Sequence, residues 1–318
     1  MGEPRTKILV VTGTAALLEL AASPASAHAF GTRYDLPLPL TLYLIGAGAA
    51  VTLSFVVMAR FLKHRGEAEE ALRFDLLSIP GIGWLGASVT LNAVRSLSVA
   101  VFVLLLAAGF FGNPDPFRNI APTFVWVVWW VGMAFTSALV GNLWALVNPW
   151  KILFTWFERA TGGFGPILSY PAWLGRWPVV VLFLAFAWME LISGQAEHPY
   201  TLAMLIVAYS AITWTGMVIF GREVWLKNGE IFSAVFGLLA RFAPTVGEVG
   251  RWEARLPAVG LLSERPVHIS TVCFVLLLLT TVAFDGILET PLWVKILDRI
   301  AESRDLRPAL IALQYAGV

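Results

Sequence analysis

The sequence of 318 residues has few charged side chains and few of the residues that build metal or redox centres. Only 14% of its residues are charged, whereas soluble domains carry about a quarter. The single cysteine, Cys273, lies in an apolar run, which excludes an intramolecular disulfide and a cysteine-based metal centre within one chain. The net charge of +1 gives no reason to expect a nucleic-acid partner. Four histidines limit any histidine site to a few ligands: His28, His64, His198 and His268.

The usual motifs of soluble enzymes are also missing. The sequence contains no Gly-x-x-x-x-Gly-Lys-Ser/Thr phosphate loop, no His-Glu-x-x-His zinc motif and no Gly-x-Ser-x-Gly nucleophile turn. The apolar runs hold no pair of histidines at a spacing that would bind haem. The evidence about function therefore comes from the apolar runs and from the polar residues between them.

Long apolar runs dominate the chain. Hydrophobic residues make up 58% of it and the mean hydropathy is +0.75. A helix of about 20 apolar residues can cross a bilayer, so we predict an all-α, polytopic transmembrane bundle within residues 40–290, with the lipid bilayer as its surroundings. The six predicted spans are Leu40–Phe61, Ser96–Phe111, Ala121–Leu146, Trp177–Gly194, Thr201–Phe220 and Val267–Phe284.

The N-terminal residues contain the three parts of an export signal in the correct order. A short positive leader precedes the apolar run Ile8–Leu18, which is too short to span a membrane, and Ala25-Ser26-Ala27 is an A-x-A cleavage site. We predict a signal peptide over residues 1–27, with an uncleaved amphipathic leader as the alternative. The mature chain would begin at His28, and residues 28–39 would form an extracytoplasmic segment.

The distribution of basic residues supports the same orientation. With an exported N-terminus, the predicted cytoplasmic loops contain most of the lysines and arginines, whereas the short outer segments contain only Arg33 and Arg118. Membrane proteins retain such positive loops on the cytoplasmic side. The export signal and the loop charges therefore predict one topology independently.

Two amphipathic segments follow spans at the predicted cytoplasmic side. They are Trp150–Arg159 and Glu230–Arg241, and we interpret both as helices lying in the inner membrane interface. Each follows a repeated pair of residues, first Gly141 and Asn148 and then Gly221 and Asn228. This weak internal repeat leaves open an alternative, a pair of re-entrant segments as in transporters built from repeats.

Polar residues gather at the outer face in this topology. They are His28, Asp35, Asp115, Arg118, Glu197, His198, Asp285 and Glu289. Histidines and carboxylates are suitable ligands for a divalent metal such as zinc or copper, and an N-terminal histidine can chelate copper through its amine and its imidazole. We therefore predict a metal site whose ligands are His28, His198, Asp285 and Glu289. The alternative is that these residues are solvated turn and helix-end residues.

Two carboxylates are candidate catalytic groups. Glu190 lies within the fourth predicted span, where an ionisable group costs ~2.5–3.5 kcal/mol at mid-helix and usually has a partner or a function. Either Glu190 or Glu197 could act as the general base that deprotonates a metal-bound water. The polar residues at the inner ends of the spans are expected to cap helices, to bond between helices or to reach the interface: Asn92, Arg95, Asn142 and Asn148.

Longer motifs resemble a known family. The segments His28-Ala-Phe-Gly-Thr-Arg-Tyr-Asp-Leu-Pro-Leu-Pro-Leu40 and Phe284-Asp-Gly-Ile-Leu-Glu-Thr-Pro-Leu-Trp293, with Asn148-Pro-Trp150 between them, resemble motifs of bacterial membrane proteins called fenitrothion hydrolases. The resemblance implies a multi-pass protein of the bacterial inner membrane that hydrolyses organophosphate triesters. It assigns no catalytic residues. Members of this family continue with further spans, so residues 291–318 are expected to form a C-terminal segment truncated before them.

The sequence therefore supports hypotheses from different classes. The first is a metal-dependent hydrolase of hydrophobic organophosphate triesters, with its site at the outer face and small hydrophobic substrates entering from the lipid. The second is a non-enzymatic metal-binding or transport component of the membrane. A membrane scaffold without a site is the third.

Overall fold

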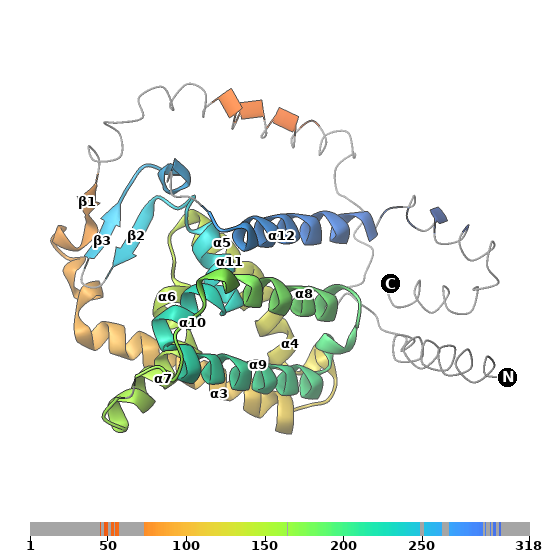
Figure 1. Ribbon diagram of the computed structural model, residues 1–318, viewed down its shortest axis with the longest axis horizontal. Coiled ribbons are helices and arrows are strands. Elements are labelled where there is room, and N and C mark those ends of the chain that lie inside the picture. Colours follow the sequence, from red (N-terminus) through yellow and green to blue (C-terminus); the bar gives the residue numbers. More distant parts are fainter. Residues whose placement is uncertain are drawn as a thin grey trace.

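The computed structural model describes most of the chain between residues 73 and 288 (Figure 1). The described residues are 45, 48, 49, 52, 53, 55, 56, 73–163, 165–248, 251–262, 267–288, 290, 293, 295, 296 and 299. The predicted signal peptide, most of the first predicted span and most of the C-terminal segment lie outside these residues.

Five helices in the described part are long and apolar enough to cross a membrane. They are Ser88–Phe111, Ile120–Leu139, Ala172–Leu191, Pro199–Phe220 and Ile269–Leu288. Each overlaps one of the predicted spans from the second to the sixth, which confirms an all-α bundle of the kind found in multi-pass membrane proteins. Four of them correspond to α3 (Ser88–Phe111), α8 (Trp177–Leu191), α9 (Pro199–Phe220) and α12 (Ile269–Leu288).

The remaining span consists of three consecutive helical segments, and the middle one is π-helical. We call it the composite span. It consists of α4 (Ile120–Thr123), the π-helical segment η4 (Phe124–Val131) and α5 (Gly132–Leu139). The helix ends well before Leu146, the predicted end of this span. The break follows at Gly141, where an added Cβ would lie 2.6 Å from the Thr245 hydroxyl oxygen, so the chain passes too close to Thr245 for any larger residue.

Four shorter helices complete the bundle. They are α6 (Trp144–Val147), α7 (Pro149–Ala160), α10 (Arg222–Asn228) and α11 (Ile231–Leu239). A polar residue caps the N-terminus of each of the two longer ones, since Asn148 accepts a hydrogen bond from the Lys151 backbone N–H and Glu230 accepts two from the first turn of α11. The two segments predicted to be amphipathic are therefore both helical, and the prediction that Asn148 caps a helix is confirmed.

The surroundings of α11 differ from the interfacial position predicted for it. Five of its residues are buried, and it packs against α5, α6, α8 and α10. Its sequence explains this position: apolar side chains surround the helix almost completely, with Ser233 as its only polar residue, and such a helix belongs in a core. By contrast, α7 buries one face and keeps charged residues such as Glu158 and Arg159 on another.

A small antiparallel sheet that the sequence did not predict lies at one end of the bundle (Figure 1). Its strands are β1 (Phe74–Asp75), β3 (Arg251–Ala254) and β2 (Thr245–Glu248), in that spatial order. Such short strands are hard to detect because alternation needs at least four residues to show. The Thr245 hydroxyl donates a 2.5 Å hydrogen bond to the carbonyl of Val140, which ties the sheet to the end of α5.

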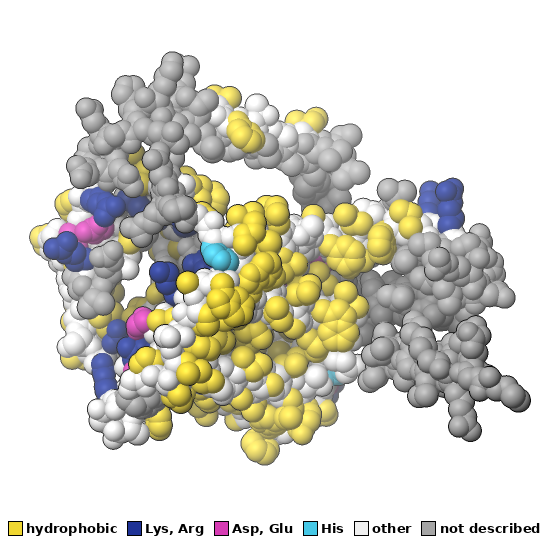
Figure 2. Space-filling view, in the orientation of Figure 1, with side chains coloured by type: hydrophobic (Ala, Val, Ile, Leu, Met, Phe, Trp, Pro, Cys, Tyr) yellow, Lys and Arg dark blue, Asp and Glu magenta, His cyan; other side chains and the backbone are white. Residues whose placement is uncertain are grey.

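Short helical turns link these elements. They are η1 (Leu76–Ser78), η2 (Gly83–Gly86), η3 (Pro116–Arg118), η5 (Ala172–Leu174), η6 (Gln195–Glu197) and η7 (Val259–Leu262). Figure 2 shows hydrophobic side chains over the spans, with most of the visible charged side chains gathered toward the end that carries the sheet and α7. This separation is expected of a protein whose apolar helices face lipid and whose charged loops face water.

Candidate functional site

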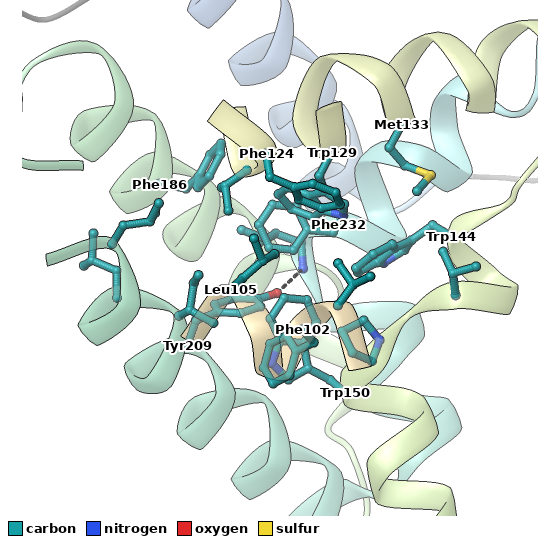
Figure 3. Close-up of a pocket in the computed structure, with 18 of the residues that line it drawn as sticks. Phe102, Leu105, Phe124, Trp129, Met133, Trp144, Trp150, Phe186, Tyr209 and Phe232 are labelled. Carbon is teal, nitrogen blue, oxygen red and sulfur yellow. Dashed lines mark hydrogen bonds between the residues drawn. The ribbon is translucent and has the colours of Figure 1, made fainter. Parts of the chain in front are cut away.

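A cavity of about 480 Å³ lies within the bundle (Figure 3). This volume is within the usual range of small-molecule sites, ~300–1,000 Å³. Its wall combines residues of α3, η4, α5, α6, α7, α8, α9 and the first turn of α11, including Phe102, Leu105, Phe124, Trp129, Met133, Trp144, Trp150, Phe186, Tyr209 and Phe232. The wall is almost entirely apolar, which suits a hydrophobic ligand.

The cavity opens at the side of the bundle. Several of its lining residues have exposed side chains, and these mark the opening: Leu97, Leu143, Ala185, Ala208 and Ile212. All of them except Leu143 lie within the spans α3, α8 and α9. When these spans cross a bilayer, this side of the cavity would face the hydrocarbon layer, and a lipid-soluble molecule could enter from there.

Aromatic rings that pack against one another form the deepest part of the wall. The Trp129 and Phe232 rings meet edge to face with centroids 4.5 Å apart, and Trp150 meets Tyr209 in the same way at 5.0 Å. The Trp150 and Phe232 rings are stacked, with an interplanar angle of 12°. Because each ring is held by its neighbours, the shape of the cavity is set before a ligand arrives.

Most polar groups of the wall form hydrogen bonds within the protein. The Trp150 indole N–H donates to the Ser210 hydroxyl at 2.7 Å, and the Trp126 indole N–H donates to the carbonyl of Ala196 at 3.1 Å. The Tyr209 hydroxyl accepts from the Ile231 backbone N–H at 3.1 Å, the bond drawn in Figure 3. These bonds orient the rings and leave few polar atoms for a ligand.

Directly behind this wall lies a fully buried carboxylate, that of Glu230. Five hydrogen bonds converge on its two oxygens. Oε1 accepts from the Tyr209 hydroxyl (2.7 Å) and the Phe232 backbone N–H (3.0 Å), and Oε2 accepts from the Trp144 indole N–H (3.2 Å), the Asn148 amide (3.1 Å) and the Ser233 backbone N–H (2.7 Å). We call this set the Glu230 cluster.

The Glu230 cluster holds an anion without a cation. Four of the five partners are N–H groups, which can only donate, and the fifth is the Tyr209 hydroxyl, so the arrangement suits a carboxylate that accepts with both oxygens. In the described part of the chain, none of the ion pairs includes Glu230. Its charge is compensated instead by hydrogen bonds and by the N-terminus of α11, whose dipole favours a negative group.

The two predicted catalytic carboxylates lie next to residues of the cavity wall. Met189 and Ala196 line the cavity, and Glu190 and Glu197 follow them in the sequence. Neither carboxylate is itself a lining residue. Glu190 is half-buried in α8, and Asp285 lies in α12, which packs against α8, so the structure places the two carboxylates on neighbouring helices.

The predicted metal site is only partly covered by the structure. His28 and Glu289 lie outside the described residues, and the side chain of His198 is exposed at the end of η6. Within the described residues, no group of three or more histidine, cysteine, aspartate or glutamate side chains could hold a metal ion. The four-ligand site therefore stays a prediction.

Sequence reasoning missed Glu230 and Tyr209 as members of one site. Glu230 was recognisable as a helix start, because it directly precedes the apolar run Ile231–Leu239. The burial of Glu230 was not recognisable from the sequence. Its side-chain donors, Trp144, Asn148 and Tyr209, come from three other helices or caps. No local pattern reports such distant partners.

Comparison with known proteins adds no assignment. No protein-family model matches the chain, and no curated protein or solved structure is detectably similar to it. What the arrangement can do follows from its own geometry: it can admit an apolar molecule from the lipid, hold it between aromatic rings and keep it next to a buried negative charge.

Proposed function

We propose that this membrane protein binds a small hydrophobic molecule in the aromatic cavity. The observation that carries the proposal is the cavity itself, which has the volume of a small-molecule site, an almost wholly apolar wall and an opening within the spans. A merely structural gap of this size would be costly, since each missing contact weakens packing.

As the specific chemistry we propose the hydrolysis of organophosphate triesters, which the resemblance to fenitrothion hydrolases implies. Two features of the protein favour it. The cavity suits the aryl and alkyl groups of such a substrate, and Glu190, beside the lining residue Met189, is available as a general base. The metal would be held by His28, His198, Asp285 and Glu289, at the outer face of the bacterial inner membrane.

A second candidate is a transport function for the same ligand. It is favoured by one observation, the meeting of two helix N-termini inside the bundle, where the amide of Asn148, the cap of α7, donates to the carboxylate of Glu230, the cap of α11. Transporters use such helix ends beside their binding sites. Movement of the ligand across proteoliposomes would distinguish this candidate from hydrolysis.

Binding can be tested with purified protein in lipid nanodiscs. Fenitrothion is a nitroaromatic compound and should quench the fluorescence of the tryptophans around the cavity, such as Trp129 and Trp150. An Ala208→Phe change narrows the opening and should weaken binding about tenfold, a cost of ~1.4 kcal/mol. The matched control is Ala211→Phe, on an exposed position of the same helix that does not line the cavity. Equal binding by both variants would contradict the proposed site.

Hydrolysis has a separate readout, the release of the yellow nitrophenol. Glu190→Gln should lower the turnover by about 10²-fold or more, which is the usual contribution of a general base. His198→Ala and removal of divalent metals should do the same if the predicted ligands hold the metal. Fenitrothion that binds but is never cleaved by the wild-type protein would rule out the hydrolase and leave the binding function.

A further inference from the structure

We propose that the cavity selects a hydrophobic quaternary cation, such as an ammonium or phosphonium ion with apolar substituents, over a neutral molecule of the same shape. The inference rests on the proposed function, because it needs the cavity to bind a ligand, and it names the chemical class of that ligand. Three features of the Glu230 cluster and the cavity wall support it.

The first feature is a buried carboxylate that hydrogen bonds stabilise but no cation neutralises. Glu230 is fully buried and accepts hydrogen bonds from five donors, and no ion pair in the described ranges involves it. Charges interact much more strongly in a protein or membrane interior than in water, because the surroundings screen them poorly. A cation anywhere in the adjoining cavity therefore gains energy that a neutral molecule does not.

The second feature is that hydrogen bonds connect this carboxylate to residues of the cavity wall. Two of the five donors, Trp144 and Tyr209, belong to the cavity wall. An indole N–H or a phenol O–H that donates to an anion becomes polarised, and its ring becomes richer in electrons. The faces of aromatic rings already attract cations, and these two rings attract them more.

The third feature is the number of rings around the same space. Trp129 and Trp150 lie next to Trp144, with ring centroids 5.4 Å and 5.8 Å from it, and Phe232 contacts all three. Several electron-rich faces around one cavity are how proteins recognise quaternary ammonium groups without a direct ion pair.

The composition of the wall also decides which cations fit. A primary ammonium group carries N–H donors that would stay unsatisfied against an apolar wall, and a metal ion needs oxygen or nitrogen ligands that the wall does not offer. The oxygens of Glu230 are occupied by five donors and lie behind the rings. A quaternary cation has no N–H group and is weakly hydrated, so it avoids both costs.

The preference can be measured with a pair of molecules of one shape. These are 4-tert-butyl-N,N,N-trimethylanilinium and 1,4-di-tert-butylbenzene, which differ by a quaternary nitrogen in place of a carbon. Binding to the protein in nanodiscs of phosphatidylglycerol and phosphatidylethanolamine is measured by equilibrium dialysis, with protein-free nanodiscs as the blank for partitioning. The cation should bind at least about tenfold more tightly than the neutral molecule.

Three variants locate the source of the preference. Glu230→Gln should remove most of the preference and leave the affinity for the neutral molecule unchanged. Tyr209→Phe removes one polarised donor and keeps the ring, so it should lower the preference by about threefold. It serves as the test if Glu230→Gln does not fold. Ala208→Phe should weaken the binding of both molecules equally, because it acts at the opening.

The outcomes separate the inference from the function on which it rests. Equal affinities of the wild-type protein for the two molecules would overturn the cation preference and leave the binding function intact. Binding of neither molecule would overturn both. Adding phosphatidylcholine to the nanodiscs tells whether a lipid headgroup supplies the quaternary group: competition with the soluble cation indicates a lipid ligand, and a lack of competition indicates a free one.

Discussion

The helices α7 and α11 begin alike and differ in one group. Each follows a short helix and starts at a polar cap, Asn148 or Glu230, with an aromatic residue two positions later. These aromatic residues, Trp150 and Phe232, stack on each other with centroids 5.9 Å apart. The two caps share a hydrogen bond of 3.1 Å, so the two helix starts face each other inside the bundle.

The difference lies in the charge of the cap and in its position. Asn148 is neutral and caps α7, which keeps one face outside the core, whereas Glu230 is charged and caps α11, which is enclosed by other helices. A neutral cap would satisfy the backbone of α11 as well as that of α7. The charged cap therefore begins the more enclosed of the two helices, where burying a charge costs the most free energy. This cost indicates that Glu230 has a role besides capping α11.

The largest expected effect comes from removing the charged cap. Glu230→Ala leaves five donors without their acceptor, and we expect a loss of ~3–5 kcal/mol in unfolding free energy, as for a broken buried charge cluster. Denaturation of the protein in detergent measures the loss. Glu223→Ala, at a side chain that is 72% exposed, is the control and should change little. A small loss at Glu230 would mean that α11 does not depend on its cap.

Changing the neutral cap should cost less. Asn148→Ala removes the acceptor for the Lys151 N–H and one donor to Glu230, and we expect a loss of ~1–3 kcal/mol. Asn148→Asp keeps the acceptor but places a second carboxylate beside Glu230, so it should cost more than Ala. Asn228→Ala is the control, because Asn228 is only partly buried and its side chain donates to the Val224 carbonyl of its own helix. If Asp were tolerated better than Ala, the anionic character of the Glu230 cluster would be contradicted.

The Tyr209 hydroxyl, which links the charged cap to the cavity wall, should contribute a still smaller amount to the unfolding free energy. Tyr209→Phe removes the hydroxyl that donates to Glu230 and accepts from the Ile231 N–H, so we expect a loss of ~1–2 kcal/mol. Tyr200→Phe, at a side chain that is 61% exposed, should be neutral under the same denaturation conditions. Identical stabilities of the two variants would show that the hydroxyl of Tyr209 contributes nothing to the cap.

The glycines that precede the two helix pairs give the smallest effects, for different reasons. Gly221 has φ of +87°, so Gly221→Ala should cost ~1 kcal/mol through backbone strain alone. Gly141→Ala acts through contact with the Thr245 hydroxyl instead. The double variant Gly141→Ala/Thr245→Ala should therefore lose less unfolding free energy than the sum of the two single variants. The losses for Gly221→Ala and Thr245→Ala should simply add. Simple additivity at both glycines, in the same thermal unfolding assay, would contradict this distinction.

The sequence predicted the spans well because hydropathy is a local property. The spans from the second to the sixth were found, although the composite span ends at Leu139, because the close approach of Gly141 to Thr245 involves residues far apart in the chain. The β-sheet was missed for a similar reason, since its first strand pairs with residues of a distant segment. The enclosed position of α11 followed from its composition but was not recognised.

The candidate site was less predictable. Glu190 and Asp285 were predicted to lie on the same side, and the structure places them near the ends of two helices that pack against each other, α8 and α12. The Glu230 cluster depends instead on Trp144 and Asn148, which lie more than 80 positions away in the sequence. Hydropathy ranks Glu230 as a polar residue at a membrane surface, and only its five donors show that it is buried.

The π-helical winding of η4 gives the cavity wall a second possible register. A π-helix bonds each N–H to the carbonyl five residues earlier instead of four. Rewinding Phe124–Val131 into an α-helix would shift the bonds by one residue and rotate the following side chains by about 100°. Trp129, whose ring meets Phe232 edge to face, belongs to this segment. The π-helical winding therefore sets which side of the span carries the Trp129 ring and so shapes the aromatic wall.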